Sequence, residues 1–369
     1  MSGSKRLLAL SGAVALTVGA VALPAGAQSP SIGAGEELKI GVVIHVIGNP
    51  FIQQIADGAK QAGAELGVDV QVVGPEGFDA EAQMALVQGL VDSGVDGIAT
   101  SVTGESMVSG LNTLIDGGLP VVQFNILRPE VKAPYVGERS LQSGRTLGAM
   151  ILEKMGGADM TGKAIIGNCA PGFLPVLDNR AKGIAEAISV APGVEVLGPF
   201  DVKSAANENY AAWEALYTAN QDATGFIGVC APDVNSLGQL QAANTDTPFV
   251  SGGYDLTSEN LAAIKDGNAY VSLGQTPFMQ GYLPVKMLVD KLTGATDYDL
   301  TTGGFIDAGT EIVTADSVIE PYDLPALTFA ELEAIAADPA KAREYYQPLV
   351  DGVIANWADF IEPVENESK

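Results

Sequence analysis

The segment from Leu38 to Leu66 joins an apolar, strand-like run directly to an amphipathic helix. The run breaks at Gly48, Asn49 and Pro50, and the apolar residues that follow recur at helical spacing on one face. Asn49 suits the N-cap of this helix and Pro50 its first position. Such a turn lies at the carboxyl end of a strand, where open α/β sheets bind their ligands.

Strand-like and helix-length runs alternate along most of the chain. The strand-like runs are rich in Val and Ile without strict alternation, which is typical of parallel strands covered by helices on both faces. They lie near 38–46, 68–73, 96–101, 119–124, 163–169, 194–199, 225–230, 248–253 and 269–274. The helical runs lie near 50–66, 79–93, 105–117, 140–155, 174–190, 206–219, 234–243, 257–266 and 277–293. A weak internal repeat of this series predicts two similar lobes with a ligand cleft between them.

The first residues have the pattern of a secretory signal peptide. Lys5 and Arg6 precede the apolar stretch Leu7–Leu23, and an A-x-A site predicts cleavage before Gln28. We therefore interpret residues 1–27 as a signal peptide, and we expect an exported, soluble protein in a bacterial periplasm.

Charge and cysteine content restrict the possible partners. The chain has 45 acidic and 19 basic residues, a formal net charge of −26, so phosphates would be repelled and nucleic-acid binding is not expected. Only Cys169 and Cys230 are present, each at the end of an apolar run. An export route permits a disulfide between them. Two free, mostly buried thiols remain the alternative.

The sequence does not favour an enzyme. His45 is the sole histidine, and no Cys/His cluster has zinc-binding spacing, so neither a metal site nor a catalytic triad is expected. Dinucleotide-binding and Walker motifs are missing, and we expect no cofactor. A glycosidase would need two carboxylates across the bond that it cleaves, and Asp255 has no obvious partner.

Together, several motifs resemble the type I periplasmic substrate-binding proteins of sugar ABC transporters, the ribose-binding-like family. The residues that carry this resemblance are IGVVIHVIGNPF at 40–51, LVDSGVDGIATSV at 90–102, LPVVQFN at 119–125, NRAKGI at 179–184, VSGGYD at 250–255 and SLGQTPFMQG at 272–281. The resemblance implies two Rossmann-like lobes with parallel sheets, joined by a hinge that the chain crosses three times, with the ligand enclosed when the lobes close.

In this frame the chain divides into four parts. After the signal peptide, an N-terminal lobe is expected over 38–137 plus 277–307 and a C-terminal lobe over 138–276 plus 308–320. A helical extension is expected over 321–369. Within the extension, a capping-box pattern and an Asp-Pro step predict helices near 329–337, 339–347 and 350–361.

Candidate ligand-binding residues lie at the ends of the predicted strands. By the resemblance, ligand contacts are carried over to Asn49, Phe51, Asn125, Arg180, Asp255 and Gln275. Strand-end position adds His45, Ser101, Asp233 and Tyr254. Planar polar side chains that can contact two hydroxyls, combined with flat apolar walls, suit a sugar.

Two positions depart from the ribose-binding pattern. Ile126 follows Asn125 where an arginine is expected, and Pro232 precedes Asp233 where an asparagine is expected. We therefore expect a small sugar or polyol other than ribose, delivered by a monomeric binding protein to an ABC permease. The alternative is a protein of the same fold that presents a sugar or quorum signal to a chemoreceptor or sensor kinase.

Overall fold

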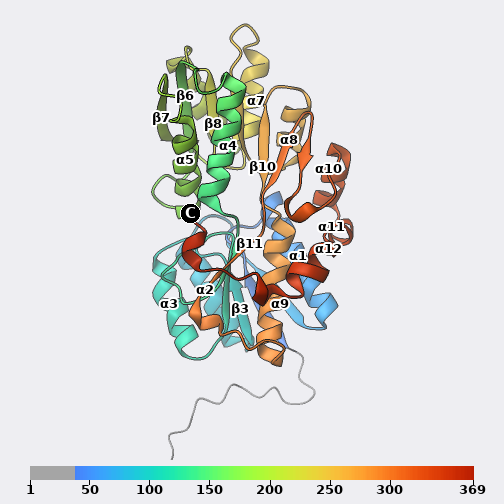
Figure 1. Ribbon diagram of the computed structural model, residues 1–369. Helices are drawn as coiled ribbons and strands as arrows, with labels where there is room; N and C mark the ends of the chain where they lie inside the picture. The colour runs from blue at the N-terminus through green and yellow to red at the C-terminus, as the bar shows by residue number, and fades with distance from the viewer. Residues whose placement is uncertain (1–37) are drawn as a thin grey trace, which may run out of the picture. The chain divides into compact units, whose positions relative to one another are not determined.

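Two sheets of mostly parallel strands organise the protein (Figure 1). The computed structural model describes residues 38–369, so the predicted signal peptide over 1–27 lies outside the described residues. Each sheet with its helices forms one lobe, as predicted for the α/β fold class. In this part of the chain, no helix combines the length and the apolar composition that crossing a membrane requires.

The first lobe is built on a sheet of six strands within the described residues. In spatial order they are β11 (Phe305–Asp307), β5 (Tyr135–Gly137), β4 (Val121–Phe124), β3 (Gly97–Thr100), β1 (Lys39–Val43) and β2 (Asp69–Val73). Its helices are α1 (Pro50–Leu66), α2 (Ala80–Asp92), α3 (Ser106–Asp116) and α9 (Pro277–Thr293). One apolar cluster packs α1 and α9 on one sheet face, and another packs α2 and α3 on the opposite face.

The second lobe is built on a sheet of seven strands, again counted within 38–369. Their order is β13 (Val318–Ile319), β12 (Glu311–Thr314), β10 (Val271–Gly274), β9 (Val250–Tyr254), β8 (Gly225–Gly228), β6 (Gly162–Asn168) and β7 (Val194–Asp201). Its helices are α4 (Ser140–Met155), α5 (Pro175–Ile188), α6 (Ala206–Ala219), α7 (Asp233–Ala243) and α8 (Ser258–Lys265). All nine predicted strands and nine predicted helices are present in the two lobes.

The chain passes three times between the sheets: between β5 and β6, between β10 and β11, and between β11 and β12. Four short strands were not predicted, namely β5, β11, β12 and β13, which are two to four residues long. Segments of this length are too short to show periodicity. Three of the four are neighbours of these connections, and β12 pairs antiparallel with β10.

Glycines allow the helices to approach closely in both lobes. In the first lobe, a Cβ on Gly58 would lie 2.1 Å from a backbone oxygen of α9, and one on Gly281 would lie 1.8 Å from a backbone oxygen of α1. The second lobe repeats this arrangement between α4 and α5, where a Cβ on Gly144 or Gly183 would lie 2.2 Å from the facing backbone. Any side chain at these positions would push the helices apart. The close contact between α4 and α5 supports the helix that carries Arg180.

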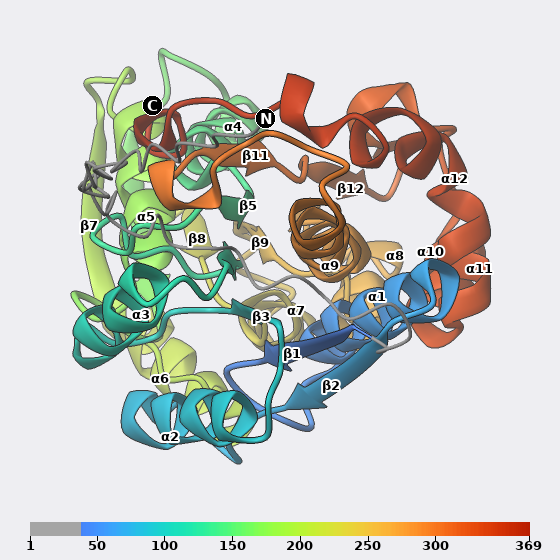
Figure 2. The same cartoon turned by 90° about the horizontal axis from the view of Figure 1, so that it is seen from below.

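The C-terminal extension runs over both lobes (Figure 2). Its helices are α10 (Phe329–Ala337), α11 (Pro339–Tyr345) and α12 (Gln347–Leu349), followed by a π-helical turn at Val350–Ile354. Thr328 and Glu331 form the predicted capping box. The single helix predicted over 350–361 is wrong, because the chain leaves helical geometry at Asn356 and forms a 3₁₀ turn at Trp357–Asp359.

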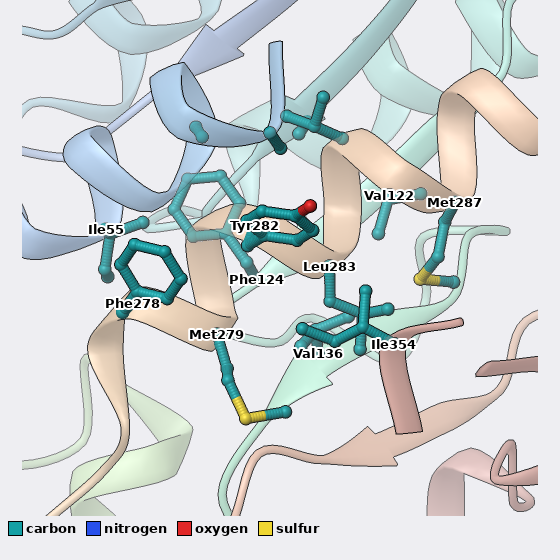
Figure 3. Packing of buried hydrophobic residues seen from close by; sticks show 14 of the residues in the cluster. Ile55, Val122, Phe124, Val136, Phe278, Met279, Tyr282, Leu283, Met287 and Ile354 are labelled. Carbon is teal, nitrogen blue, oxygen red and sulfur yellow. The ribbon is translucent and has the colours of Figure 1, made fainter. Parts of the chain in front are cut away.

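Part of the extension belongs to the core of the first lobe. Figure 3 shows Ile354 next to Leu283 of α9 and Val136 of β5. Seven extension side chains are buried in the same apolar cluster, namely Leu324, Ala342, Tyr346, Leu349, Val353, Ile354 and Trp357. In the second lobe, Leu332 of α10 packs with Leu261 and Val313. The extension therefore contributes core residues as well as covering the surface.

Candidate functional site

A cleft of about 690 Å³ lies where the carboxyl ends of the two sheets face each other. The loops after β1, β2 and β4 line it from the first lobe. The loops after β6, β7, β8, β9 and β10 line it from the second lobe. Parallel strands all end at the same edge of their sheet, so side chains far apart in the sequence converge here.

Seven of the ten predicted site residues line this cleft: His45, Asn49, Phe51, Asn125, Arg180, Asp255 and Gln275. Ser101, Asp233 and Tyr254 are not among the lining residues. The structure thus brings most of the predicted set together from both lobes. Contact with a ligand stays a prediction for all ten.

The turn at the start of α1 serves both the helix and the cleft. The Asn49 side-chain oxygen accepts hydrogen bonds from the backbone N–H groups of Phe51 at 2.9 Å and Ile52 at 3.3 Å. This cap fixes the Asn49 side chain, whose amide NH₂ remains available at the cleft. Phe51 is 8% exposed, and packs in the core while one edge borders the cleft.

Arg180 is held by a carboxylate that the sequence analysis missed. Its Nε and Nη2 donate to one oxygen of Glu138, and its Nη1 donates to the Val229 carbonyl at 3.1 Å. The guanidinium carbon lies 4.0 Å from the centre of the Tyr254 ring. The side chains of Arg180 and Glu138 are only 5% and 2% exposed. Glu138 comes directly after β5. Because β5 was not predicted, Glu138 was not considered as a residue at a strand end.

Asp255 and Gln275 form the second polar pair of the cleft. Gln275 Nε2 donates to Asp255 Oδ1 at 2.6 Å. Burial raises the pKa of Asp255, and the charge of Arg180 opposes that rise. Asp255 has a φ of 70° and Asn125 a φ of 59°, both in the left-handed region, which Asp and Asn adopt more readily than most residues. Both strands therefore end in a sharp turn at the cleft.

Asn125 is tied to the first lobe and borders the cleft. Its Nδ2 donates to Gln280 Oε1 at 3.0 Å, while Gln280 Nε2 donates to the Gln275 carbonyl at 2.6 Å. This chain of hydrogen bonds joins the end of β4 to the start of α9, next to the residue that pairs with Asp255. Polar residues from both lobes are thus coupled at one end of the cleft.

The three residues that do not line the cleft lie one layer behind it. Ser101 is buried, with its Oγ 3.2 Å from His45 Nδ1 and 3.1 Å from Gln83 Nε2. Tyr254 is buried beneath Arg180, and its hydroxyl is bonded to Ser143 at 2.9 Å. These two side chains position residues that do line the cleft. A strand end places a residue near the cleft without determining which way its side chain points.

Asp233 is a buried structural residue and does not line the cleft. Its carboxylate accepts hydrogen bonds from Asn209 at 2.7 Å, from the Trp213 indole at 2.8 Å and from the backbone N–H of Cys230 at 2.8 Å. Burial raises its pKa to about 6 despite these donors. The carboxylate thus joins α6, the end of β8 and the start of α7 beneath the cleft wall.

Cys169 and Cys230 form a disulfide at the cleft wall. Their Cα atoms are 6.2 Å apart, within the ordinary range for such bonds. They follow the adjacent strands β6 and β8, so the bond fixes the relative position of two cleft loops. The sequence left open whether the two cysteines form a disulfide or remain free thiols. In the structure they form the disulfide.

His45 is buried and packs against a tilted aromatic ring. Its ring centre lies 5.1 Å from that of Phe78, and burial lowers its pKa to about 3. The side chain is therefore neutral at physiological pH. Within 38–369, no cluster of three or more His, Cys, Asp or Glu residues could hold a metal ion.

The low pKa of His45 makes stability depend on pH in a defined direction. Below its usual pKa of 6.5, the unfolded chain binds a proton that the folded chain excludes, so stability is lost as pH falls toward about 3. Between pH 7 and pH 5 we expect His45→Asn to lose about 2 kcal/mol less stability than the wild type does. Urea unfolding at both pH values measures this difference. Because His45 is the only histidine, an imidazole NMR signal that titrates near 6.5 would contradict the prediction.

Residues 40–296 match the family model of the periplasmic binding protein domain. The xylose/arabinose-binding protein XylF of Sulfolobus acidocaldarius is 25% identical over 303 residues, which cover 77% of this chain and 72% of that protein. The ribose import binding protein RbsB of Bacillus subtilis is 23% identical over 289 residues, covering 76% of this chain and 90% of that protein.

A solved structure with the same fold is an ABC transporter solute-binding protein from Burkholderia graminis C4D1M in complex with D-arabinose. It superposes with a TM-score of 0.71 at 23% identity, and the alignment covers 77% of this chain and 98% of that one. At this level of identity the likeness concerns the fold.

Proposed function

Because this chain belongs to the periplasmic binding protein family, we propose that it captures a small sugar or polyol between its lobes and delivers it to an ABC importer. The observation that carries this proposal is the convergence of Asn49, Asn125, Arg180, Asp255 and Gln275 on one cleft. The relatives named for xylose, arabinose and ribose support the ligand class. The predicted signal peptide supports a periplasmic location.

The proposed mechanism is closure of the two lobes around the ligand. We propose that the lobes comprise 38–137 plus 277–307 and 138–276 plus 308–320, with the three connections acting as the hinge. A ligand that contacts both lobes binds the closed form better than the open form and shifts the population toward it. The permease then recognises the closed form of a monomeric binding protein.

Two apolar positions in the wall of the cleft restrict the ligand. Neutral hydrogen bonds contribute about 0.5–1.5 kcal/mol each and those to charged groups about 1.5–3 kcal/mol, so several must act together. Ile126 and Pro232 both line the cleft, and neither side chain offers a hydrogen bond. We therefore propose a ligand other than ribose, with apolar surface where the ribose binders have polar contacts.

The alternative role uses the same cleft to present a ligand to a chemoreceptor or sensor kinase. The two roles differ in the protein that recognises the closed form. Ligand-dependent stimulation of the ATPase of a reconstituted ABC importer would support transport. A purified protein that binds sugar but fails to stimulate the cognate importer would favour signalling.

Asp255→Asn tests the proposed binding role of the cleft. The amide keeps the size of the side chain but loses a charged acceptor, so we expect sugar affinity to fall by about 10- to 100-fold. Calorimetric titration with L-arabinose, D-xylose and other pentoses, hexoses and polyols that stabilise the wild type in a thermal-shift screen would measure this change.

Asp266→Asn is the matched control, because Asp266 is an exposed residue that ends α8 in the same lobe. Its sugar affinity should equal that of the wild type. If no sugar or polyol in a broad panel stabilises the wild type, or if both variants bind equally well, the proposed function is wrong.

A further inference from the structure

The cleft has two chemically different ends. Strand β11 of the first sheet passes directly into β12 of the second, so the β11 and β12 edges adjoin a connection between the lobes. The polar residues Asn125, Asp255 and Gln275 follow β4, β9 and β10, toward this side. The loops after β1 and β2, and after β6 and β7, follow strands toward the opposite edges. We refer to these four loops, without Asn49 at the end of the first, as the outer end of the cleft.

Large apolar side chains are concentrated at this outer end. Ile47 and Phe78 come from the first lobe and are each 48% exposed; Phe173 comes from the second lobe and is 47% exposed. All three line the same cleft as the polar residues. Large apolar side chains that are exposed together at one site indicate a binding surface for another molecule. Because the outer end is continuous with the proposed sugar site, its occupant is expected to be part of the same ligand.

One contact holds the ring of Phe78 in place without a ligand, and another holds the backbone of the loop that carries Phe173. Phe78 packs against the neutral imidazole of His45, whose ring centre is 5.1 Å away. The Phe173 carbonyl accepts a hydrogen bond of 2.7 Å from Arg128 of the first lobe, across the cleft. A preorganised aromatic surface binds more tightly, because less ordering entropy is lost on binding.

The size of the cleft points in the same direction. Its volume of about 690 Å³ lies within the range of about 300–1,000 Å³ that is typical of sites for drug-sized ligands. This space leaves room for more than one ring before the lobes close. Aromatic rings bind flat, apolar faces, and one face of a sugar ring is largely C–H.

We propose that the outer end is a second subsite, which binds a ring linked to the captured sugar. The ligand class is then a glycoside, such as a disaccharide or an aryl glycoside. Its first sugar ring lies among the polar groups near the connections, and its second ring lies against Phe78 and Phe173. This inference rests on the proposed function and specifies its ligand class.

The test compares free sugars with glycosides of the same sugars. The probes are D-xylose and L-arabinose, xylobiose, and both anomers of 4-nitrophenyl D-xyloside and 4-nitrophenyl L-arabinoside. With the wild type we expect at least one glycoside to bind about tenfold more tightly than its parent sugar. Phe78→Ala and Phe173→Ala should each remove about five- to tenfold of glycoside affinity and change the affinity for the parent sugar less than about twofold.

Two further variants keep the result interpretable. Phe78→Tyr keeps the ring and should retain the preference for glycosides. Phe360→Ala removes a similarly exposed phenylalanine, 42% exposed, that does not line the cleft, and should behave as the wild type. Because Phe78 and Phe173 are half exposed, their alanine variants should keep the melting temperature of the wild type.

Different results would overturn different statements. If parent sugars bind but no glycoside binds more tightly, the second subsite does not exist. The same holds if the alanine variants weaken parent sugar and glycoside equally, or if they weaken neither. If neither sugars nor glycosides bind the wild type, the proposed function itself is wrong.

Discussion

Replacing Trp357 by alanine is expected to lower the free energy of unfolding by about 3–5 kcal/mol, the usual effect of removing a large aromatic side chain from a packed core. Trp357 is 1% exposed, and its indole donates a hydrogen bond of 3.0 Å to Asp290 of α9. Its ring also packs edge-on against Tyr298 at 5.4 Å. Urea unfolding at pH 7 would measure the change.

Phe360→Ala is the matched control, since it lies three residues further along the same extension. Phe360 is 42% exposed, and we expect its replacement to change stability by no more than about 0.5 kcal/mol. A loss for Trp357→Ala as small as that for Phe360→Ala would mean that the extension is only loosely attached. A large difference between them would mean that residues 339–357 contribute to the folding stability of the first lobe.

The sequence showed only part of this arrangement. Trp357 and Phe360 both fall within the helix predicted over 350–361, yet the structure buries Trp357 in the core and leaves Phe360 half exposed. Short helical segments have no long periodic pattern from which a buried face can be read. The apolar cluster that receives Trp357 is assembled mainly from residues much earlier in the chain.

The two lobes were more predictable for a physical reason. Buried parallel strands and amphipathic helices both have strong local patterns, and the strand-to-helix turn at Asn49 and Pro50 is determined by capping chemistry that acts within a few residues. Parallel topology then places the strand ends together, which is why seven predicted site residues line one cleft.

What the sequence could not supply is the direction of individual side chains and their long-range partners. Ser101 and Tyr254 end their strands as expected but point to other side chains beneath the cleft surface. Glu138 pairs with Arg180, which lies 42 residues further along the chain. Glu138 follows β5, a strand of only three residues that local patterns do not reveal. The aromatic outer end likewise depends on loops from four strands.

Glu138→Gln is expected to lower the free energy of unfolding by about 3–5 kcal/mol, because it leaves the buried guanidinium of Arg180 without a carboxylate. Burial of both side chains makes this effect large. The Arg180 side chain should also shift from its place over Tyr254. Sugar affinity, measured by calorimetry, should therefore fall together with stability.

Glu186→Gln is the control for the loss of a charge on the surface. Glu186 pairs with Arg145 of α4, but both side chains are about 40% exposed, and removing such a pair changes stability by at most about 1 kcal/mol. Equal losses for Glu138→Gln and Glu186→Gln would show that burial of the Glu138–Arg180 pair adds nothing.

The double variant Glu138→Gln, Arg180→Met separates the structural from the binding contribution of this pair. Removing both charges leaves neither member of the pair as an unpaired ion in the interior, so the double variant should recover part of the stability that Glu138→Gln loses. Full recovery is not expected, because Arg180→Met also removes the charge that opposes the raised pKa of buried Asp255. The double variant cannot recover sugar affinity if the guanidinium contacts the ligand. Recovery of both properties would mean that Arg180 only supports the cleft, whereas recovery of stability alone would make Arg180 a ligand-binding residue held in place by Glu138.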